Sequence, residues 1–206
     1  MKKLLIAILT LALAQTTFAQ QAGRFRMGMD LGPAIPQGGG IGALVNLEPK
    51  VNLNNKMNVG IRFGVAGIAK DVTYYDFNED YDGEVSANVS VSGTFDYYFN
   101  NGKSNAAPFI GVGYGYYALS NLDVENGDFD NPDDIGNLDA DFKWAPMVRA
   151  GVELGKFRMG AEYNFVPKSD LQNTSGQVIG EASNQYFGFT LGFYVGGGKW
   201  RNNSNF

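Results

Sequence analysis

The chain has 206 residues, which leaves room for one domain of about 180 residues after an export segment and makes two separate cores a tight fit. It contains no cysteine and no histidine, so disulfides, thiolate metal sites and Ser-His or Cys-His catalytic pairs are excluded, and we expect neither an enzyme nor a cofactor. Its formal net charge is −5, and we expect no nucleic-acid partner because phosphate backbones would be repelled.

The first predicted element, residues 1–19, has the parts of a cleaved signal peptide. Lys2 and Lys3 form a basic start, residues 4–14 form an apolar stretch, and Thr17 and Ala19 supply the small residues expected just before a cleavage site. An apolar stretch of this length covers about half of a 30 Å hydrocarbon core, which is too little for a membrane helix. We expect cleavage after Ala19, export, and a mature domain of residues 20–206.

The mature domain contains eight stretches in which apolar residues fall on every second position, which is the period of a β-strand with two different faces. The 28 glycines and the many tyrosine and phenylalanine residues also favour strands and turns. In chain order, the predicted strands are residues 24–32, 42–53, 56–69, 84–99, 108–119, 143–154, 157–166 and 185–195.

The predicted connections alternate between short and long. Bacterial outer-membrane barrels have short turns at the periplasmic end and longer loops outside the cell. The pattern therefore predicts an all-β fold: an eight-stranded antiparallel up-and-down transmembrane β-barrel with short periplasmic turns and longer extracellular loops. The short connections are residues 54–56, 100–107 and 155–156, and the long ones are residues 33–41, 70–83, 120–142 and 167–184.

The polar face of the strands indicates which side meets lipid. Alternation alone also suits a soluble barrel with an apolar interior, but this polar face is rich in glycine, as at Gly111, Gly113 and Gly115. Glycine weakens a water-facing strand, whereas in a narrow lumen it makes room for long charged side chains. Buried charges must be paired, and basic and acidic residues are equally numerous on this face. The predicted lumen ion-pair network comprises Arg26, Lys50, Arg62, Arg149 and Arg158 with Asp30, Glu48, Asp96, Glu153 and Glu162.

Aromatic residues near the predicted strand ends fit the two belts where a membrane meets water. Packing in an ordinary core would use the same residues, so this signal is weak. The candidates for the belts are Tyr97, Phe99, Tyr116, Tyr117, Trp144, Phe157, Phe165, Phe187 and Phe193.

Two of the long connections carry clustered acidic side chains. In residues 120–142, Asp128, Asp130, Asp133 and Asp134 are weak candidates for oxygen ligands of Ca²⁺. Their spacing differs from that of an EF-hand loop, so a solvated charge run is the favoured interpretation and no metal site is predicted. Residues 70–83 mix tyrosines and acids, a composition that suits contact with a surface protein or glycan, although an ordinary exposed loop explains it as well.

Several stretches resemble the small eight-stranded outer-membrane barrels typified by the OmpA transmembrane domain and OmpX, particularly the stand-alone barrels of Bacteroidota-type genomes. The resemblance implies an outer-membrane location, contact with membrane lipids, and insertion by periplasmic chaperones and the barrel-assembly machinery. One departure is that residues 196–206 follow the last strand. The stretches that carry the resemblance are residues 18–20, 47–50, 160–164 and 186–193.

Three functions remain open from the sequence. The first is a non-catalytic barrel that contributes to envelope integrity and to surface interaction through its loops. The alternatives are a narrow porin-like channel for ions or small solutes, and a soluble periplasmic ligand-binding barrel.

Overall fold

A computed structural model describes residues 22–37, 39–74, 81–100, 102–122, 141–172, 178–198 and 200. The predicted signal peptide, residues 1–19, lies outside the described residues, and so do Asp128, Asp130, Asp133 and Asp134. Over the ranges that are described, no helix has the length and hydropathy needed to cross a membrane.

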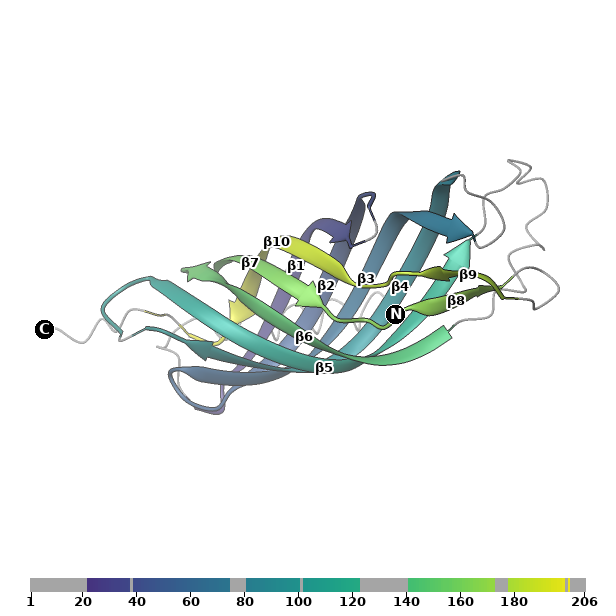
Figure 1. Cartoon of the computed structure of the whole chain (residues 1–206). Helices are drawn as coiled ribbons and strands as arrows, with labels where there is room; N and C mark the ends of the chain where they lie inside the picture. The colour runs from purple at the N-terminus through teal and green to yellow at the C-terminus, as the bar shows by residue number, and fades with distance from the viewer. Residues whose placement is uncertain are drawn as a thin grey trace, which may run out of the picture.

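Eight strands form a closed antiparallel barrel (Figure 1). Each strand pairs with the next one along the chain, and the last, β10, pairs with both β7 and β1, which closes the sheet. This arrangement confirms the predicted eight-stranded up-and-down barrel. The barrel strands are β1 (Phe25–Pro36), β2 (Gly42–Asn52), β3 (Met57–Tyr74), β4 (Tyr81–Tyr98), β5 (Ala106–Leu122), β6 (Asp141–Leu154), β7 (Phe157–Asn164) and β10 (Tyr186–Gly196).

Several strands extend further toward the long connections than the sequence predicts. The pattern places the end of the first strand at residue 32, but β1 continues to Pro36. Pro33 has no N–H to donate, yet it still lies opposite Ala43 in β2, so only the ladder to β10 is interrupted there. The neighbouring strands therefore hold this segment in the sheet although it contains a proline. Strands β3, β4 and β5 likewise run past their predicted outer limits, while β7 ends at Asn164 rather than at residue 166.

The seventh connection, predicted as a loop, contains an additional hairpin. It is formed by β8 (Ser169–Gln172) and β9 (Val178–Ala182), which pair antiparallel with each other. β9 also pairs with the outer end of β3, where Thr73 lies opposite Glu181. Figure 1 shows this hairpin at the end of the barrel where β3 and β4 extend furthest. Strands of four and five residues are too short to give a clear periodic signal, and the edge that holds them comes from a distant part of the chain.

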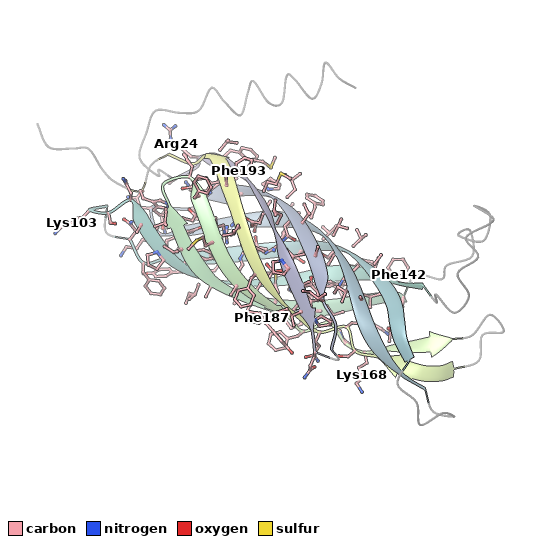
Figure 2. The ribbon with its side chains drawn as sticks, turned by 90° about the horizontal axis from the view of Figure 1, so that it is seen from above. Arg24, Lys103, Phe142, Lys168, Phe187 and Phe193 are labelled. Atoms are coloured by element: carbon pink, nitrogen blue, oxygen red, sulfur yellow. The ribbon has the colours of Figure 1, made fainter. Side chains whose placement is uncertain are left out.

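The two faces of the barrel are the reverse of those of a soluble protein. On the outer face, Leu31 is 57% exposed and Phe193 is 53% exposed, and apolar side chains cover this surface (Figure 2). On the inner face, Asp96 and Glu153 are completely buried. An apolar exterior of this kind would be unfavourable in water, and it is the surface that a barrel presents to lipid.

One aromatic residue predicted for an interfacial belt lies inside the barrel. Tyr117 is 1% exposed, and its hydroxyl donates a hydrogen bond to Asn164 Oδ1 at 2.9 Å. The prediction was wrong because Tyr116 and Tyr117 are adjacent in a strand, so only one of them can face outward. Tyr116 takes the outer position.

The lumen near the long connections contains a cluster of buried apolar side chains, whereas the sequence predicted a lumen filled by ion pairs. Small and large residues alternate there, from Ala34 and Ala66 to Leu119 and Tyr186, and all are buried. This apolar layer forms a packed core at one end of the barrel. Its members are Ala34, Leu44, Ala66, Ile68, Tyr117, Leu119, Ala145, Val166 and Tyr186.

Candidate functional site

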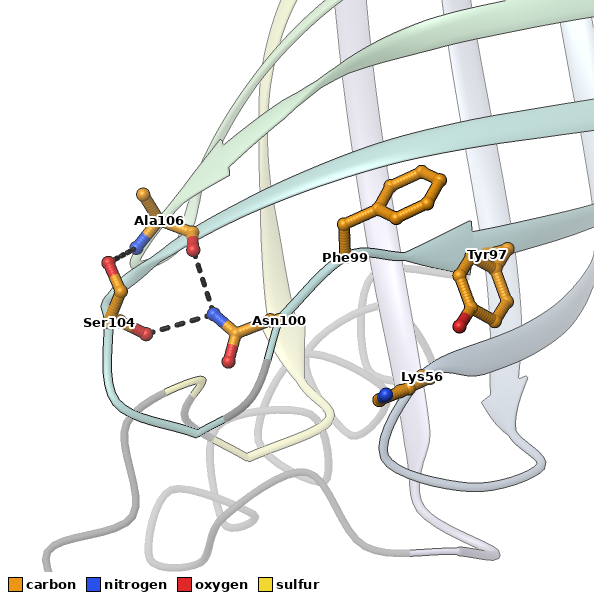
Figure 3. A pocket seen from close by; sticks show the side chains of 6 residues that line it. All are labelled: Lys56, Tyr97, Phe99, Asn100, Ser104 and Ala106. Atoms are coloured by element: carbon orange, nitrogen blue, oxygen red, sulfur yellow. Dashed lines mark hydrogen bonds between the residues drawn. The ribbon is translucent and has the colours of Figure 1, made fainter.

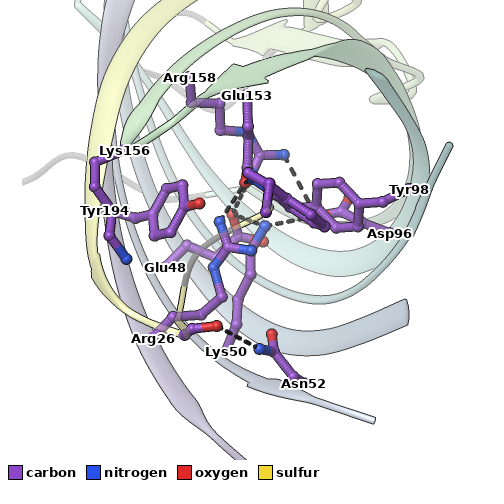
Figure 4. A network of polar contacts seen from close by, with 12 residues as sticks. Arg26, Glu48, Lys50, Asn52, Asp96, Tyr98, Glu153, Lys156, Arg158 and Tyr194 are labelled. Carbon is purple, nitrogen blue, oxygen red and sulfur yellow. Dashed lines mark hydrogen bonds and ion pairs between the residues drawn. The ribbon is translucent and has the colours of Figure 1, made fainter. Parts of the chain in front are cut away.

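The half of the lumen nearest the short turns holds a cluster of buried charges (Figure 4). Asp96 of β4 lies at its centre. Lys50 Nζ donates a hydrogen bond to Asp96 Oδ2 at 2.6 Å, and Arg149 Nε donates one to Asp96 Oδ1 at 2.7 Å. Arg158 Nη2 lies 3.4 Å from Asp96 Oδ2. These partners come from β2, β6 and β7, so the cluster ties strands together across the lumen.

Glu48 is the second anion shared by these cations. Arg149 donates two hydrogen bonds to its carboxylate, at 2.7 Å and 3.1 Å, an arrangement that combines charge with fixed geometry. Lys50 Nζ lies 3.0 Å from Glu48 Oε2, and the Thr94 hydroxyl donates a hydrogen bond to Glu48 Oε1 at 2.6 Å. Both carboxylate oxygens of Glu48 are therefore occupied by donors.

Glu153 joins this cluster to an aromatic layer at the short-turn end. Arg26 Nη2 donates a hydrogen bond to Glu153 Oε1 at 2.6 Å, and the Tyr98 hydroxyl donates one at 2.8 Å. The Arg26 guanidinium also stacks over the Tyr194 ring, 3.6 Å from its centroid, which shields the cation between an anion and a π face. Arg158 lies over the ring of Phe109 in the same way, at 4.1 Å.

The remaining residues of the predicted network lie apart from this cluster. Arg62 and Glu162 form a separate ion pair closer to the long connections, where Asn164 Nδ2 also donates a hydrogen bond to Glu162 Oε1 at 3.1 Å. Asp30 is buried but forms no ion pair within the described ranges, and its Oδ1 has no hydrogen-bond partner there. Seven of the ten predicted residues are thus directly linked: Arg26, Glu48, Lys50, Asp96, Arg149, Glu153 and Arg158.

Glycine provides the space that the cluster needs. A Cβ atom on Gly111 would overlap the Asp96 carboxylate and would lie 3.0 Å from Arg149 Nε. Gly111 lies directly opposite both residues, since β5 pairs with Asp96 on one side and with Arg149 on the other. A side chain at this position would displace the central ion pair.

The C-terminal segment closes the short-turn end of the lumen, which the sequence analysis did not foresee. Gly196, Gly197 and Gly198 have φ values of 79°, 69° and 84°, a conformation that favours glycine and turns the chain back toward the barrel. Trp200 is then 4% exposed, with its ring 4.5 Å from that of Tyr98. Its indole N–H donates a hydrogen bond to Glu153 Oε2 at 3.1 Å.

Further contacts hold this segment in place. Asn52 Nδ2 donates a hydrogen bond to the Gly197 carbonyl at 3.1 Å, and Lys156 Nζ donates one to the Gly198 carbonyl at 2.7 Å. The sequence signal that could have indicated this closure is a run of three glycines, followed closely by a tryptophan, after the last predicted strand. The aromatic residues missed by the sequence analysis are Tyr98, Phe109, Tyr194 and Trp200.

The charged groups of this site are hydrogen-bonded to one another, which limits the chemistry that they can perform. The carboxylates of Glu48, Asp96 and Glu153 each accept from at least two donors. No group of three or more potential metal-ligating side chains occurs in the part of the chain that the structure describes. The arrangement is suited to filling and bracing a lumen.

An eight-stranded barrel with an apolar exterior and a lumen of paired charges defines the class of transmembrane β-barrels. Comparison with known families gives the narrower assignment. The model of the family described as "Outer membrane protein beta-barrel domain" matches residues 5–194, and the chain belongs to this family.

The chain is similar to several solved structures at low sequence identity, and the one with a TM-score above 0.5 has the same fold. Neisserial surface protein A is 13% identical, with a TM-score of 0.54, and the match covers 84% of this chain and 97% of that one. The N-terminal barrel domain of Pseudomonas aeruginosa OprF is 10% identical (TM-score 0.48), covering 86% and 99% of the two chains. Ail, the attachment invasion locus protein of Yersinia pestis, is 12% identical (TM-score 0.40), covering 85% and 99%. Among curated proteins, none matches.

Proposed function

We propose that this protein is a closed, non-catalytic barrel of the bacterial outer membrane that contributes to the integrity of the envelope. The observation that carries the proposal is the filling of the lumen. Apolar residues pack its outer end, linked ion pairs occupy the half nearer the short turns, and Trp200 covers the aromatic layer at the inner end. We expect a lumen packed in this way to have no continuous water-filled path, because four of its buried carboxylates, those of Glu48, Asp96, Glu153 and Glu162, are paired with cations.

Planar-bilayer recording tests this proposal against the narrow porin-like channel. We expect the purified barrel to insert without stable single-channel steps. Stable conductance in the wild type, abolished when Arg62 or Arg149 is replaced by glutamate, would refute the closed barrel and support the channel. Folding of the purified barrel is verified separately by the shift in gel migration that folded barrels show before and after heating in detergent.

The soluble periplasmic ligand-binding barrel is disfavoured by the exterior. A water-soluble barrel would need a polar outer surface, whereas large apolar side chains such as Ile61 and Phe193 are more than half exposed. We expect the protein to remain with the membrane fraction until detergent is added. Release into the aqueous fraction without detergent would contradict the membrane assignment.

The outer-membrane location requires export, and we propose that residues 1–19 are removed as a signal peptide. The basic start, the short apolar stretch and the small residues Thr17 and Ala19 support this. Periplasmic chaperones and the barrel-assembly machinery would then insert the barrel. Intact mass measurement of protein purified from membranes is expected to give a chain beginning at Gln20, and a mass that includes Met1 would refute cleavage.

A second function, contact with a surface protein or glycan, is supported by the long-connection end. There β3 and β4 pair beyond the apolar layer, and the β8–β9 hairpin adds to the edge of β3, giving a sheet that extends past the barrel. Two of the connections at this end, residues 70–83 and 120–142, are acidic, which suits a basic partner. Cells displaying the protein are expected to adhere to an immobilised protein or glycan, and to lose adhesion when residues 75–80 become a Gly-Ser linker. Equal adhesion of both strains would refute this role.

A further inference from the structure

The short-turn end of the barrel is basic, and this contrasts with the opposite end. The segments at this end, residues 22–24, 53–56, 99–105 and 155–156, contain Arg24, Lys56, Lys103 and Lys156 and no acidic residue. By contrast, residues 120–142 contain eight acidic side chains. In Figure 2, Arg24 and Lys103 lie at one end of the barrel while Lys168 lies toward the other. The molecule therefore carries a rim of positive charge on the side that faces the periplasm.

A pocket lies in this rim where the first and second short turns meet the outer face (Figure 3). Lys56 borders it on one side, and the turn that carries Asn100 and Ser104 borders it on the other. Tyr97 and Phe99 line it from the membrane side, with their rings in an edge-to-face pair 5.1 Å apart. Phe99 is 56% exposed on the lipid-facing surface. The pocket thus joins a cation and polar groups to an aromatic wall that is continuous with the apolar exterior.

Hydrogen bonds within the two turns position these residues before any ligand is present. Asn54 Oδ1 accepts a hydrogen bond from the Lys56 amide at 2.7 Å, and the Lys56 carbonyl accepts one from the Tyr98 amide at 2.7 Å. Asn100 Nδ2 donates to the carbonyls of Ser104 and Ala106, at 3.0 Å and 2.7 Å. Ser104 Oγ accepts a hydrogen bond from the Ala106 amide, so its own O–H remains able to donate.

We infer that this pocket binds the phosphate of an anionic phospholipid in the periplasmic leaflet. The Lys56 ammonium supplies the counter-charge, and Ser104 and Tyr97, which line the same pocket, carry hydroxyl groups that can supply further donors. Phe99 then packs along the start of an acyl chain, since aromatic side chains favour the boundary between headgroups and hydrocarbon. The inference rests on the proposed membrane location. An aromatic wall facing lipid favours a phospholipid over free phosphate, which has no apolar part to place there.

The test measures lipid retention by the full-length folded protein. The barrel is exchanged into micelles that contain either phosphatidylglycerol or phosphatidylcholine, and bound lipid is counted by native mass spectrometry. We expect phosphatidylglycerol to be retained and Lys56→Gln to weaken its retention about fivefold, the effect of one lysine at an anionic lipid surface. Phe99→Ala is expected to weaken the retention of the lipid without weakening the binding of inorganic phosphate.

Lys103→Gln is the matched control, because it removes the same charge from the same rim but does not line the pocket. Equal losses in Lys56→Gln and Lys103→Gln would overturn the site and leave only general attraction to the rim. Displacement of the lipid by inorganic phosphate at similar concentration would overturn the lipid as ligand. Heat-shifted gel migration is recorded for every variant, so a folded barrel without lipid preference refutes this inference alone and leaves the closed barrel intact.

Discussion

Replacing Asp96 by asparagine tests whether the lumen cluster is held together by its charges. The substitution keeps the shape of the side chain but removes a charge that is completely buried and lies within 3.4 Å of Lys50, Arg149 and Arg158. Breaking a buried ion pair from one side costs about 3 to 5 kcal/mol, because the partner charge stays buried without compensation. We expect Asp96→Asn to lower the free energy of unfolding by about this much, which lowers the ratio of folded to unfolded protein by a factor of about 10² to 5 × 10³.

The assay is unfolding by guanidinium in detergent micelles, followed by tryptophan fluorescence and by gel migration. Asp141→Asn is the matched control, since Asp141 is 39% exposed and pairs with Lys143 at 3.0 Å. Exposed pairs contribute about 0 to 1 kcal/mol, so this variant should unfold close to the wild type. Adding Lys50→Met to Asp96→Asn removes one surplus cation and is expected to recover part of the loss.

The reasoning would be refuted if Asp96→Asn and Asp141→Asn unfolded at the same denaturant concentration. That outcome would mean that water enters the lumen and screens the cluster as it screens surface charges. Failure of Lys50→Met to recover stability would indicate that hydrogen-bond geometry, rather than charge balance, dominates.

Three further sets of substitutions probe the outer face, the glycine lining and the C-terminal closure. Val112→Arg places a charge midway along β5 on the lipid side and should cost about 2 to 4 kcal/mol of unfolding free energy in vesicles, whereas no effect would contradict lipid contact. Gly111→Ala should destabilise the barrel because its Cβ overlaps the Asp96 carboxylate, while Gly67→Ala, with no atom within 4 Å of the added Cβ, should be tolerated. Trp200→Ala should cost about 3 kcal/mol and Trp200→Phe about 1 kcal/mol in the same unfolding assay, and equal stability of both variants with the wild type would show that Trp200 does not pack in the lumen.

The number of barrel strands and the two faces of each strand were accessible from local pattern. Alternation of period two is a property of neighbouring residues, so Asp96 on one face and Phe95 on the other could be assigned without knowing any partner. The same rule, applied strictly, would have placed Tyr117 inside the lumen. The short β8–β9 hairpin could not be found in this way, because the pairing of β9 with β3 joins segments more than 100 residues apart.

The sequence by itself determined that this chain has a polar face, rich in glycine and balanced in charge, and an apolar face suited to lipid. Only the tertiary structure decided which charges meet, because contacts such as Arg26 with Glu153 depend on the register of every strand between them as the sheet curls closed. It also decided that Trp200 lies inside the barrel. Burial of that ring depends on a turn of three glycines and on contacts with Tyr98 and Glu153 from distant strands. Local periodicity predicts neither the turn nor these contacts.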